Sequence, residues 1–167
     1  MKSTLTRTLA GLTLVATLTL AVALLSRSAS ASLQESQSNG GRIEGTWRVQ
    51  VTLRNCQTGA ELRNFPALLT FAHGGTLTGT STVLSTGLRS PDHGIWNHTG
   101  GQNYHAVDEA FIFNPAGAWV STQRLTQDIQ LAADGDTFLS NATTEFFDTA
   151  GNLTLTGCAT AVATRME

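Results

Sequence analysis

The chain has 167 residues, of which 41% are hydrophobic and 13% are charged. Lys2 is its only lysine, which excludes Schiff-base chemistry and a lysine-dependent phosphate site from the rest of the chain. Residues 32–167 contain seven arginines and twelve acidic residues, a net charge of −5 with no basic cluster, and this argues against nucleic acid as a partner.

The N-terminus has the layout of a secretory signal peptide. Two basic residues precede an apolar run from Leu9 to Leu25, and Ser28-Ala29-Ser30-Ala31 supplies the small residues of a cleavage site. We therefore expect residues 1–31 to be removed and the mature protein to be periplasmic or secreted, without stable membrane insertion after cleavage. An uncleaved membrane anchor is the alternative.

The segment after the cleavage site, residues 32–42, consists mostly of Ser, Gln, Asn and Gly, and we expect it to be a disordered linker. One domain, residues 43–167, follows it. This domain contains Cys56 and Cys158, and an even number of cysteines in an exported protein predicts one disulfide.

Within this domain the apolar residues recur at every second position, the period of half-buried β-strands. We expect strands at Trp47–Leu53, Phe65–His73, Leu77–Val83, Gly94–His98, His105–Asn114, Trp119–Leu131, Phe138–Phe146 and Leu153–Ala163. Short turns rich in Gly, Asp and Asn separate them, and Ser85–His93 is the longest connection. Eight consecutive strands predict an all-β fold, a single eight-stranded antiparallel up-and-down barrel, with a β-sandwich as the alternative.

The two ends of the domain favour the barrel. If the first and last strands pair antiparallel with Trp47 opposite Arg165, the numbers of all paired residues have the same sum. Cys56 and Cys158 then fall within one diagonal step of each other and on one face. The disulfide and the pairing therefore require nearly the same register, whereas a sandwich does not require its terminal strands to pair.

Gly45-Thr46-Trp47 at the start of the first strand and Arg165 at the end of the last resemble the calycin group, which comprises lipocalins, avidin-like proteins and fatty-acid-binding proteins. The resemblance implies a barrel in which Arg165 packs on Trp47 at the closed end, a cation–π contact worth ~0.5–2 kcal/mol. Later lipocalin motifs and the avidin tryptophans are not evident, so the ligand class does not carry over. The segment Ser90–Trp96, Ser-Pro-x-His-Gly-x-Trp, is similar to one in a group of exported bacterial proteins of unassigned function.

The expected barrel interior combines large apolar, small and polar side chains. Phe65, Leu69 and Phe71 face a wall made of Ala159, Ala161 and Ala163, which leaves either a meshed core or a cavity. We expect the three alanines to point inward and to face open volume. In the fifth strand Val107, Phe111 and Phe113 form the apolar face. The polar residues whose parity places them inside are His73, Ser81, Gln127, Ser140 and Thr144. The ligand-binding residues we predict are His73, Ser81, Tyr104, His105, Gln127 and Ser140.

No catalytic, cofactor or metal motif stands out, and we expect none. The four histidines, His73, His93, His98 and His105, lack the spacing of metal ligands. Gly74-Gly75 and Gly100-Gly101 are expected to form hairpin turns. Asp92 is expected to cap the turn after Pro91, with Trp96 in the core, although a functional loop is the alternative.

Three functions are compatible with this sequence. The first is an exported protein that binds a small, partly apolar molecule. The second is a barrel-type isomerase or cyclase with His73, Tyr104 or His105 as its acid–base group, and the third is an envelope protein that acts through its surface. A lined cavity would favour the first two. A titratable group inside the cavity with a shifted pKa would favour the enzyme.

Overall fold

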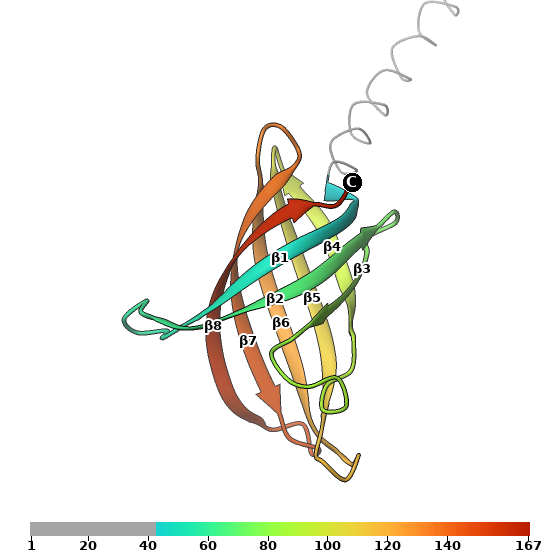
Figure 1. Cartoon of the computed structure of the whole chain (residues 1–167), viewed down its shortest axis with the longest axis vertical. Coiled ribbons are helices and arrows are strands. Elements are labelled where there is room, and N and C mark those ends of the chain that lie inside the picture. Colours follow the sequence, from blue (N-terminus) through green and yellow to red (C-terminus); the bar gives the residue numbers. More distant parts are fainter. Residues whose placement is uncertain (1–42) are drawn as a thin grey trace, which may run out of the picture. The chain divides into compact units, whose positions relative to one another are not determined.

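The computed structural model describes residues 43–167, which form one closed barrel of eight antiparallel strands in sequence order (Figure 1). The strands are β1 (Gly45–Arg54), β2 (Glu61–Ala72), β3 (Thr76–Ser81), β4 (Asp92–Gly100), β5 (Asn103–Phe113), β6 (Trp119–Leu131), β7 (Thr137–Phe147) and β8 (Leu153–Arg165). The predicted up-and-down barrel is confirmed, and the sandwich is excluded. The predicted signal peptide and linker lie outside the described residues. Between residues 43 and 167 no helix has the length and apolarity needed to cross a membrane.

The barrel closes through β1 and β8 in the predicted register. Trp47 pairs with Arg165, and the ladder continues to the pair Arg54–Cys158. Cys56 and Cys158 form a disulfide with their Cα atoms 5.3 Å apart, within the predicted range of ~4.4–6.8 Å. The disulfide therefore locks the strand pair that closes the barrel.

Arg165 covers one end of the barrel. Its guanidinium carbon lies 4.3 Å from the centroid of the Trp47 ring, and its Nη1 donates to the Glu44 carbonyl at 2.6 Å. At Gly45, where φ is +125°, a Cβ atom would lie 2.8 Å from Arg165 Nη1. The glycine of the Gly-x-Trp sequence is therefore needed for two reasons: its backbone conformation favours glycine, and a side chain there would collide with Arg165.

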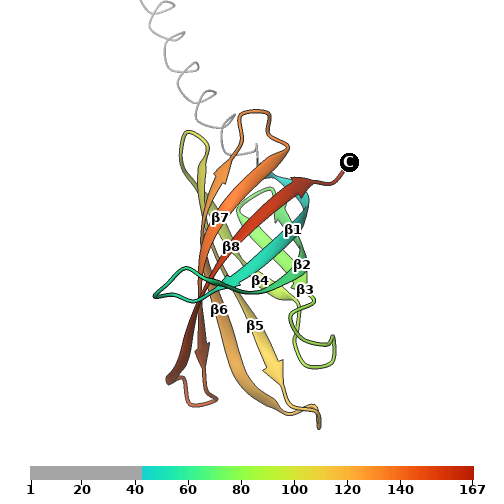
Figure 2. The same cartoon turned by 60° about the vertical axis from the view of Figure 1, so that its left-hand side comes forward.

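Aromatic side chains fill this closed end beneath Arg165. Trp47 and Phe138 lie with ring centroids 4.9 Å apart, and Phe71 lies 6.0 Å from Phe138 and 6.1 Å from Trp96. Tyr104 completes the group, 5.9 Å from Trp96. All five rings are buried, so this end is a packed core. In Figure 2, β1 begins and β8 ends side by side at this end of the barrel.

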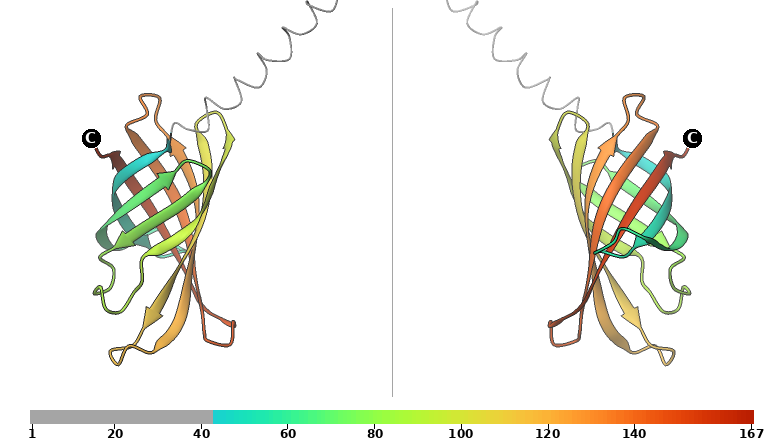
Figure 3. Two further views of the ribbon diagram at one scale, coloured as in Figure 1. Left: turned by 90° about the vertical axis from the view of Figure 1, so that its right-hand side faces the viewer. Right: turned by 90° about the vertical axis from the view of Figure 1, so that its left-hand side faces the viewer.

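At the other end, the β5–β6 and β7–β8 hairpins extend beyond the remaining strands (Figure 3). A bulge interrupts each hairpin, at Ile112/Phe113 and at Phe146/Phe147. The outer side chains Phe111, Trp119 and Leu153 are exposed here.

The segment between β3 and β4 runs alongside the projecting part of β5. Ser90 N donates to Phe111 O, and Phe113 N donates to Leu88 O, both at 2.9 Å. Arg89 forms a β-bridge with Ile112. Two consequences follow: β4 starts at Asp92, earlier than the predicted Gly94, and the Arg89 side chain is buried inside the barrel.

Strand β5 faces the opposite way from our prediction. Its buried residues are Tyr104, Ala106, Asp108 and Ala110, whereas Phe111 is exposed. The cause is the pairing with β6, in which Asp108 lies opposite Leu125 and Ala106 opposite Gln127. Paired residues share a face of the sheet, so the inward side of β6 decides which side of β5 is inside.

Candidate ligand-binding site

A cavity of about 310 Å³ occupies the barrel beyond the aromatic end. Its walls are mostly apolar and include Val49 on β1, Phe65 and Leu69 on β2, and Ala159 and Ala161 on β8, which adjoins β1. Leu62 and Leu155 also line it and are 64% and 60% exposed, so the cavity reaches the surface at the end opposite Trp47. Its volume lies at the lower end of the ~300–1,000 Å³ typical of small-molecule sites.

A chain of hydrogen-bonded polar side chains lies against this cavity. We call it the polar network, and its members are Arg89, Asp92, Asp108, Gln123, Gln127 and Thr144. Each of them is buried and each lines the cavity. They come from the segment before β4 and from the four consecutive strands β4, β5, β6 and β7, so one continuous wall of the barrel carries the polar site.

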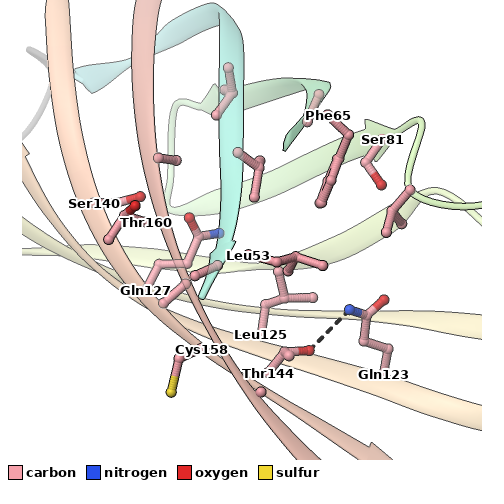
Figure 4. A pocket seen from close by; sticks show the side chains of 18 of the residues that line it. Leu53, Phe65, Ser81, Gln123, Leu125, Gln127, Ser140, Thr144, Cys158 and Thr160 are labelled. Atoms are coloured by element: carbon pink, nitrogen blue, oxygen red, sulfur yellow. Dashed lines mark hydrogen bonds between the residues drawn. The ribbon is translucent and has the colours of Figure 1, made fainter. Parts of the chain in front are cut away.

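Arg89 is the centre of the polar network. Its Nη1 donates to Asp92 Oδ2 at 3.0 Å, and its Nη2 bonds the other oxygen of the same carboxylate. Its Nε donates to Gln123 Oε1 at 2.8 Å, and Gln123 Nε2 donates in turn to Thr144 Oγ1 at 3.0 Å. Figure 4 shows this last bond, which joins Gln123 and Thr144 across the neighbouring strands β6 and β7. The two-pronged contact compensates the burial of both charges in Arg89 and Asp92.

Asp108 joins the network from β5. It accepts a hydrogen bond from Gln127 Nε2 at 3.1 Å and is hydrogen-bonded to the Asp92 side chain. Burial, and secondly the charge of Asp92, raise the pKa of Asp108 from 3.8 to about 7. Arg89 and Gln127 act in the opposite direction but do not cancel this increase. The carboxyl group therefore exchanges a proton near neutral pH.

Two glycines make room for these carboxyl groups. Gly94 pairs with Asp108, and a Cβ atom at Gly94 would overlap the Val107 carbonyl oxygen and the Asp108 backbone. Gly79 pairs with Asp92, and a Cβ there would lie 3.2 Å from Asp92 Oδ2. The glycine of the Ser-Pro-x-His-Gly-x-Trp segment thus allows β4 and β5 to approach closely at the site.

Ser140 on β7 also lines the cavity. It is only 4% exposed, and its Oγ has no hydrogen-bond partner among the described residues. A buried hydroxyl without a partner costs about 1–3 kcal/mol. A molecule in the cavity would therefore meet an unused hydroxyl next to the polar network, and Figure 4 shows Ser140 close to Gln127.

The structure places only some of the predicted site residues together. Ser81, Gln127 and Ser140 line the cavity, as parity predicted. Tyr104 is buried in the aromatic end, outside the cavity lining.

Two of the predicted site residues are not inside the barrel, and placing His73 there was wrong. His73 follows the end of β2, its side chain is 94% exposed, and its Nδ1 lies 3.0 Å from Glu44 Oε1. His105 lies on the outer face of β5, where its Nδ1 is 2.9 Å from Asp128 Oδ1. The strand that would have kept His73 inside ends one residue earlier, at Ala72.

The predicted wall of small residues is present, although only part of it borders the cavity. Ala159 and Ala161 line the cavity. Ala163 is 1% exposed within the core at the closed end, where it pairs with Val49 and Phe138. The expectation that all three alanines face open volume is therefore wrong for Ala163.

Sequence reasoning missed Arg89, Asp92, Asp108 and Gln123 as site residues. Asp92 was expected to cap a turn, but it is a buried partner of Arg89. Asp108 has the same parity as Ala106 and Ala110, and this pattern of small residues on both sides of one acid was the available indication. Arg89 lies outside any periodic segment and offered none.

No known family model matches the chain, and no curated protein matches it in sequence. Across the described part of the chain, no three side chains of His, Cys, Asp or Glu are grouped so as to hold a metal ion.

Proposed function

We propose that this is an exported, calycin-like protein that binds one small, mainly apolar molecule inside its barrel. The observation that carries the proposal is the cavity of about 310 Å³, closed at one end by packed aromatic rings and bordered by a buried polar network. Apolar walls with a few convergent polar groups are the usual form of a small-molecule site. The Cys56–Cys158 disulfide is consistent with the oxidising compartment that the proposal requires.

Filling the cavity tests this proposal. Ala161 lines the cavity from β8, whereas its neighbour Val162 is 54% exposed on the outer face. We expect the purified protein to bind the neutral fluorescent dye N-phenyl-1-naphthylamine and the Ala161→Phe variant to lose this binding while remaining folded. The matched variant Val162→Phe should bind the dye as the unaltered protein does.

Native mass spectrometry of protein purified from the periplasm complements the dye assay, because it would detect a co-purified ligand. Overpacking a solid core costs about 1–3 kcal/mol or more. If Ala161→Phe lost that much stability and the unaltered protein bound neither dye nor ligand, the interior would be solid. The proposal would then be wrong, and a function through the surface would replace it.

A second candidate, an acid–base enzyme such as an isomerase or cyclase, is favoured by Asp108. A carboxyl group with a pKa of about 7 in a mostly apolar cavity can take up and return a proton at neutral pH. In this version of the second candidate Asp108 replaces His73 and His105, because both histidines lie outside the cavity.

Deuterium exchange separates the enzyme from the binding protein. The co-purified ligand is incubated with the protein in D2O and then analysed by mass spectrometry. An enzyme that moves a proton at carbon should incorporate deuterium or form an isomer, and Asp108→Asn should abolish this change. A ligand recovered without deuterium and unaltered would contradict the enzyme.

A further inference from the structure

The polar network uses several of its hydrogen-bond donors on its own members, and its carboxyl groups keep acceptor positions for a ligand. Arg89 donates to Asp92 and Gln123, Gln123 donates to Thr144, and Gln127 donates to Asp108. A carboxyl group, by contrast, has about four lone-pair positions, and Asp108 uses only some of them. A ligand group that donates hydrogen bonds therefore fits the acceptor positions that Asp108 leaves unused.

The charges in the network point the same way. It contains one guanidinium, that of Arg89, and two carboxyl groups, those of Asp92 and Asp108. With both carboxyl groups ionised the network would have a charge of −1 in a mostly apolar cavity, and such a buried charge is costly unless it is paired. The other arginine on the cavity wall, Arg54, donates to Thr160 at 2.8 Å and to the Gly59 carbonyl at 3.1 Å, away from the network. A cation in the ligand would compensate the missing charge.

Ser140 is an independent indication of a ligand at this position. Its hydroxyl is buried, has no partner among the described residues and faces the same cavity. On the adjoining strands Ser140 pairs with Ile129, and the next inward pair is Gln127–Ala142. The unused hydroxyl thus lies one inward position from the glutamine that bonds Asp108, toward the closed end.

We propose that the ligand is an amine, a molecule with an apolar body and one basic nitrogen that is positively charged when bound between the Asp92–Asp108 carboxyl pair and Ser140. This inference rests on the proposed function, since it names the chemical class that the cavity takes. A primary ammonium has three N–H donors, enough for the carboxylate of Asp108 and the hydroxyl of Ser140 together. When the cation binds, the proton shared by the carboxyl pair leaves to solvent, so charge is conserved within the cavity.

Three probes with the same chain, octylamine, octan-1-ol and octanoate, test the inference by displacement of N-phenyl-1-naphthylamine. We expect octylamine to bind about tenfold more tightly than octan-1-ol, the ratio expected when a hydrogen bond to a charged group replaces one between neutral groups. Octanoate should bind most weakly, because its carboxylate would add a further negative charge beside Asp92 and Asp108. Calorimetry at pH 6 in two buffers of different ionisation enthalpy should detect proton release with octylamine and none with octan-1-ol.

Two variants assign the preference to residues. Asp108→Asn should reduce the preference for the amine over the alcohol to within about twofold, and Ser140→Ala should weaken amine binding by about two- to tenfold. Asp134→Asn, at an exposed carboxyl in the turn between β6 and β7, is the matched control and should preserve the preference.

The possible outcomes separate this inference from the proposed function. If the amine and the alcohol bind equally without proton release, or if octanoate binds best, the amine inference is wrong while the binding function stands. If neither the dye nor any probe binds, the binding function itself fails. Because proton release is measured on the unaltered protein, the test remains decisive even if Asp108→Asn does not fold.

Discussion

Replacing Asp108 by Asn should remove a pH dependence from the stability of this barrel. The pKa of Asp108 is raised from 3.8 to about 7, chiefly by burial and then by the charge of Asp92. Between these two pH values the folded protein therefore binds more protons than the unfolded chain does. Stability falls as the pH rises through this window. The reason is that Asp108 has the lower pKa in the unfolded chain, so deprotonation favours the unfolded chain over the folded protein.

The size of the effect follows from the two pKa values. The full increase corresponds to about 4 kcal/mol of free energy of unfolding, lost between about pH 4 and pH 7. Between pH 5 and pH 8 the loss is about 3 kcal/mol. Asparagine has nearly the shape of the protonated acid, so it can donate to Asp92 and accept from Gln127 without ionising. At pH 5 the Asp108→Asn variant should therefore be about as stable as the unaltered protein.

Urea denaturation at pH 5, 6, 7 and 8, with the disulfide intact, measures this difference. We expect Asp108→Asn to gain about 3 kcal/mol relative to the unaltered protein between pH 5 and pH 8. Asp134→Asn removes an exposed carboxyl and should follow the unaltered protein at every pH. Parallel profiles for all three proteins would refute the argument that Asp108 is buried with a raised pKa.

Three further predictions concern the frame of the barrel. Gly94→Ala should reduce the free energy of unfolding by at least about 3 kcal/mol, because the new Cβ overlaps β5. Gly87→Ala is the control: its Cβ meets no atom within 4 Å, so it should change the free energy of unfolding by less than about 0.5 kcal/mol. Thermal unfolding compares the two variants. Arg165→Gln should lower the free energy of unfolding, measured by urea denaturation, by about 2–3 kcal/mol, because it loses the contact with the Trp47 ring and the hydrogen bonds to the Glu44 and Gly135 carbonyl oxygens. An unchanged stability would contradict the role of this arginine in closing the barrel. Reducing the Cys56–Cys158 disulfide should lower the free energy of unfolding by up to ~4–5 kcal/mol. The measurement is the urea midpoint with and without dithiothreitol, and no shift in it would mean that the bridge does not restrain the unfolded chain.

The number of strands and the closure of the barrel could be predicted from the sequence because both depend on local or terminal features. Alternating apolar residues mark each strand, and turns such as Gly74-Gly75 mark where each one ends. The closing register followed from the chain ends, because Trp47 and Arg165 imply the same pairing as the disulfide. These features need no knowledge of what lies across the barrel.

The inward face of β5 could not be predicted in this way. Alternation shows which residues share a face, but not which face is inside. In β5 the more apolar face, with Val107 and Phe111, is on the outside. This is possible because Phe111 lies on the part of the hairpin that projects beyond the other strands, where it packs edge-on against Trp119 with ring centroids 6.1 Å apart. Asp108 is acceptable inside because Gln127 and the Arg89–Asp92 pair surround it.

By itself, then, the sequence determined an eight-stranded barrel with a disulfide at its seam and Arg165 over Trp47, because short-range periodicity and the pairing of the ends suffice for that. Parity also placed Ser81, Gln127, Ser140 and Thr144 inside, but only the tertiary structure decided the rest of the candidate site. Arg89 comes from a segment without periodicity, and it is placed inside by pairing with the projecting end of β5. The raised pKa of Asp108 likewise depends on burial and on a charge from another strand, and neither is a property of the residues next to it in the chain.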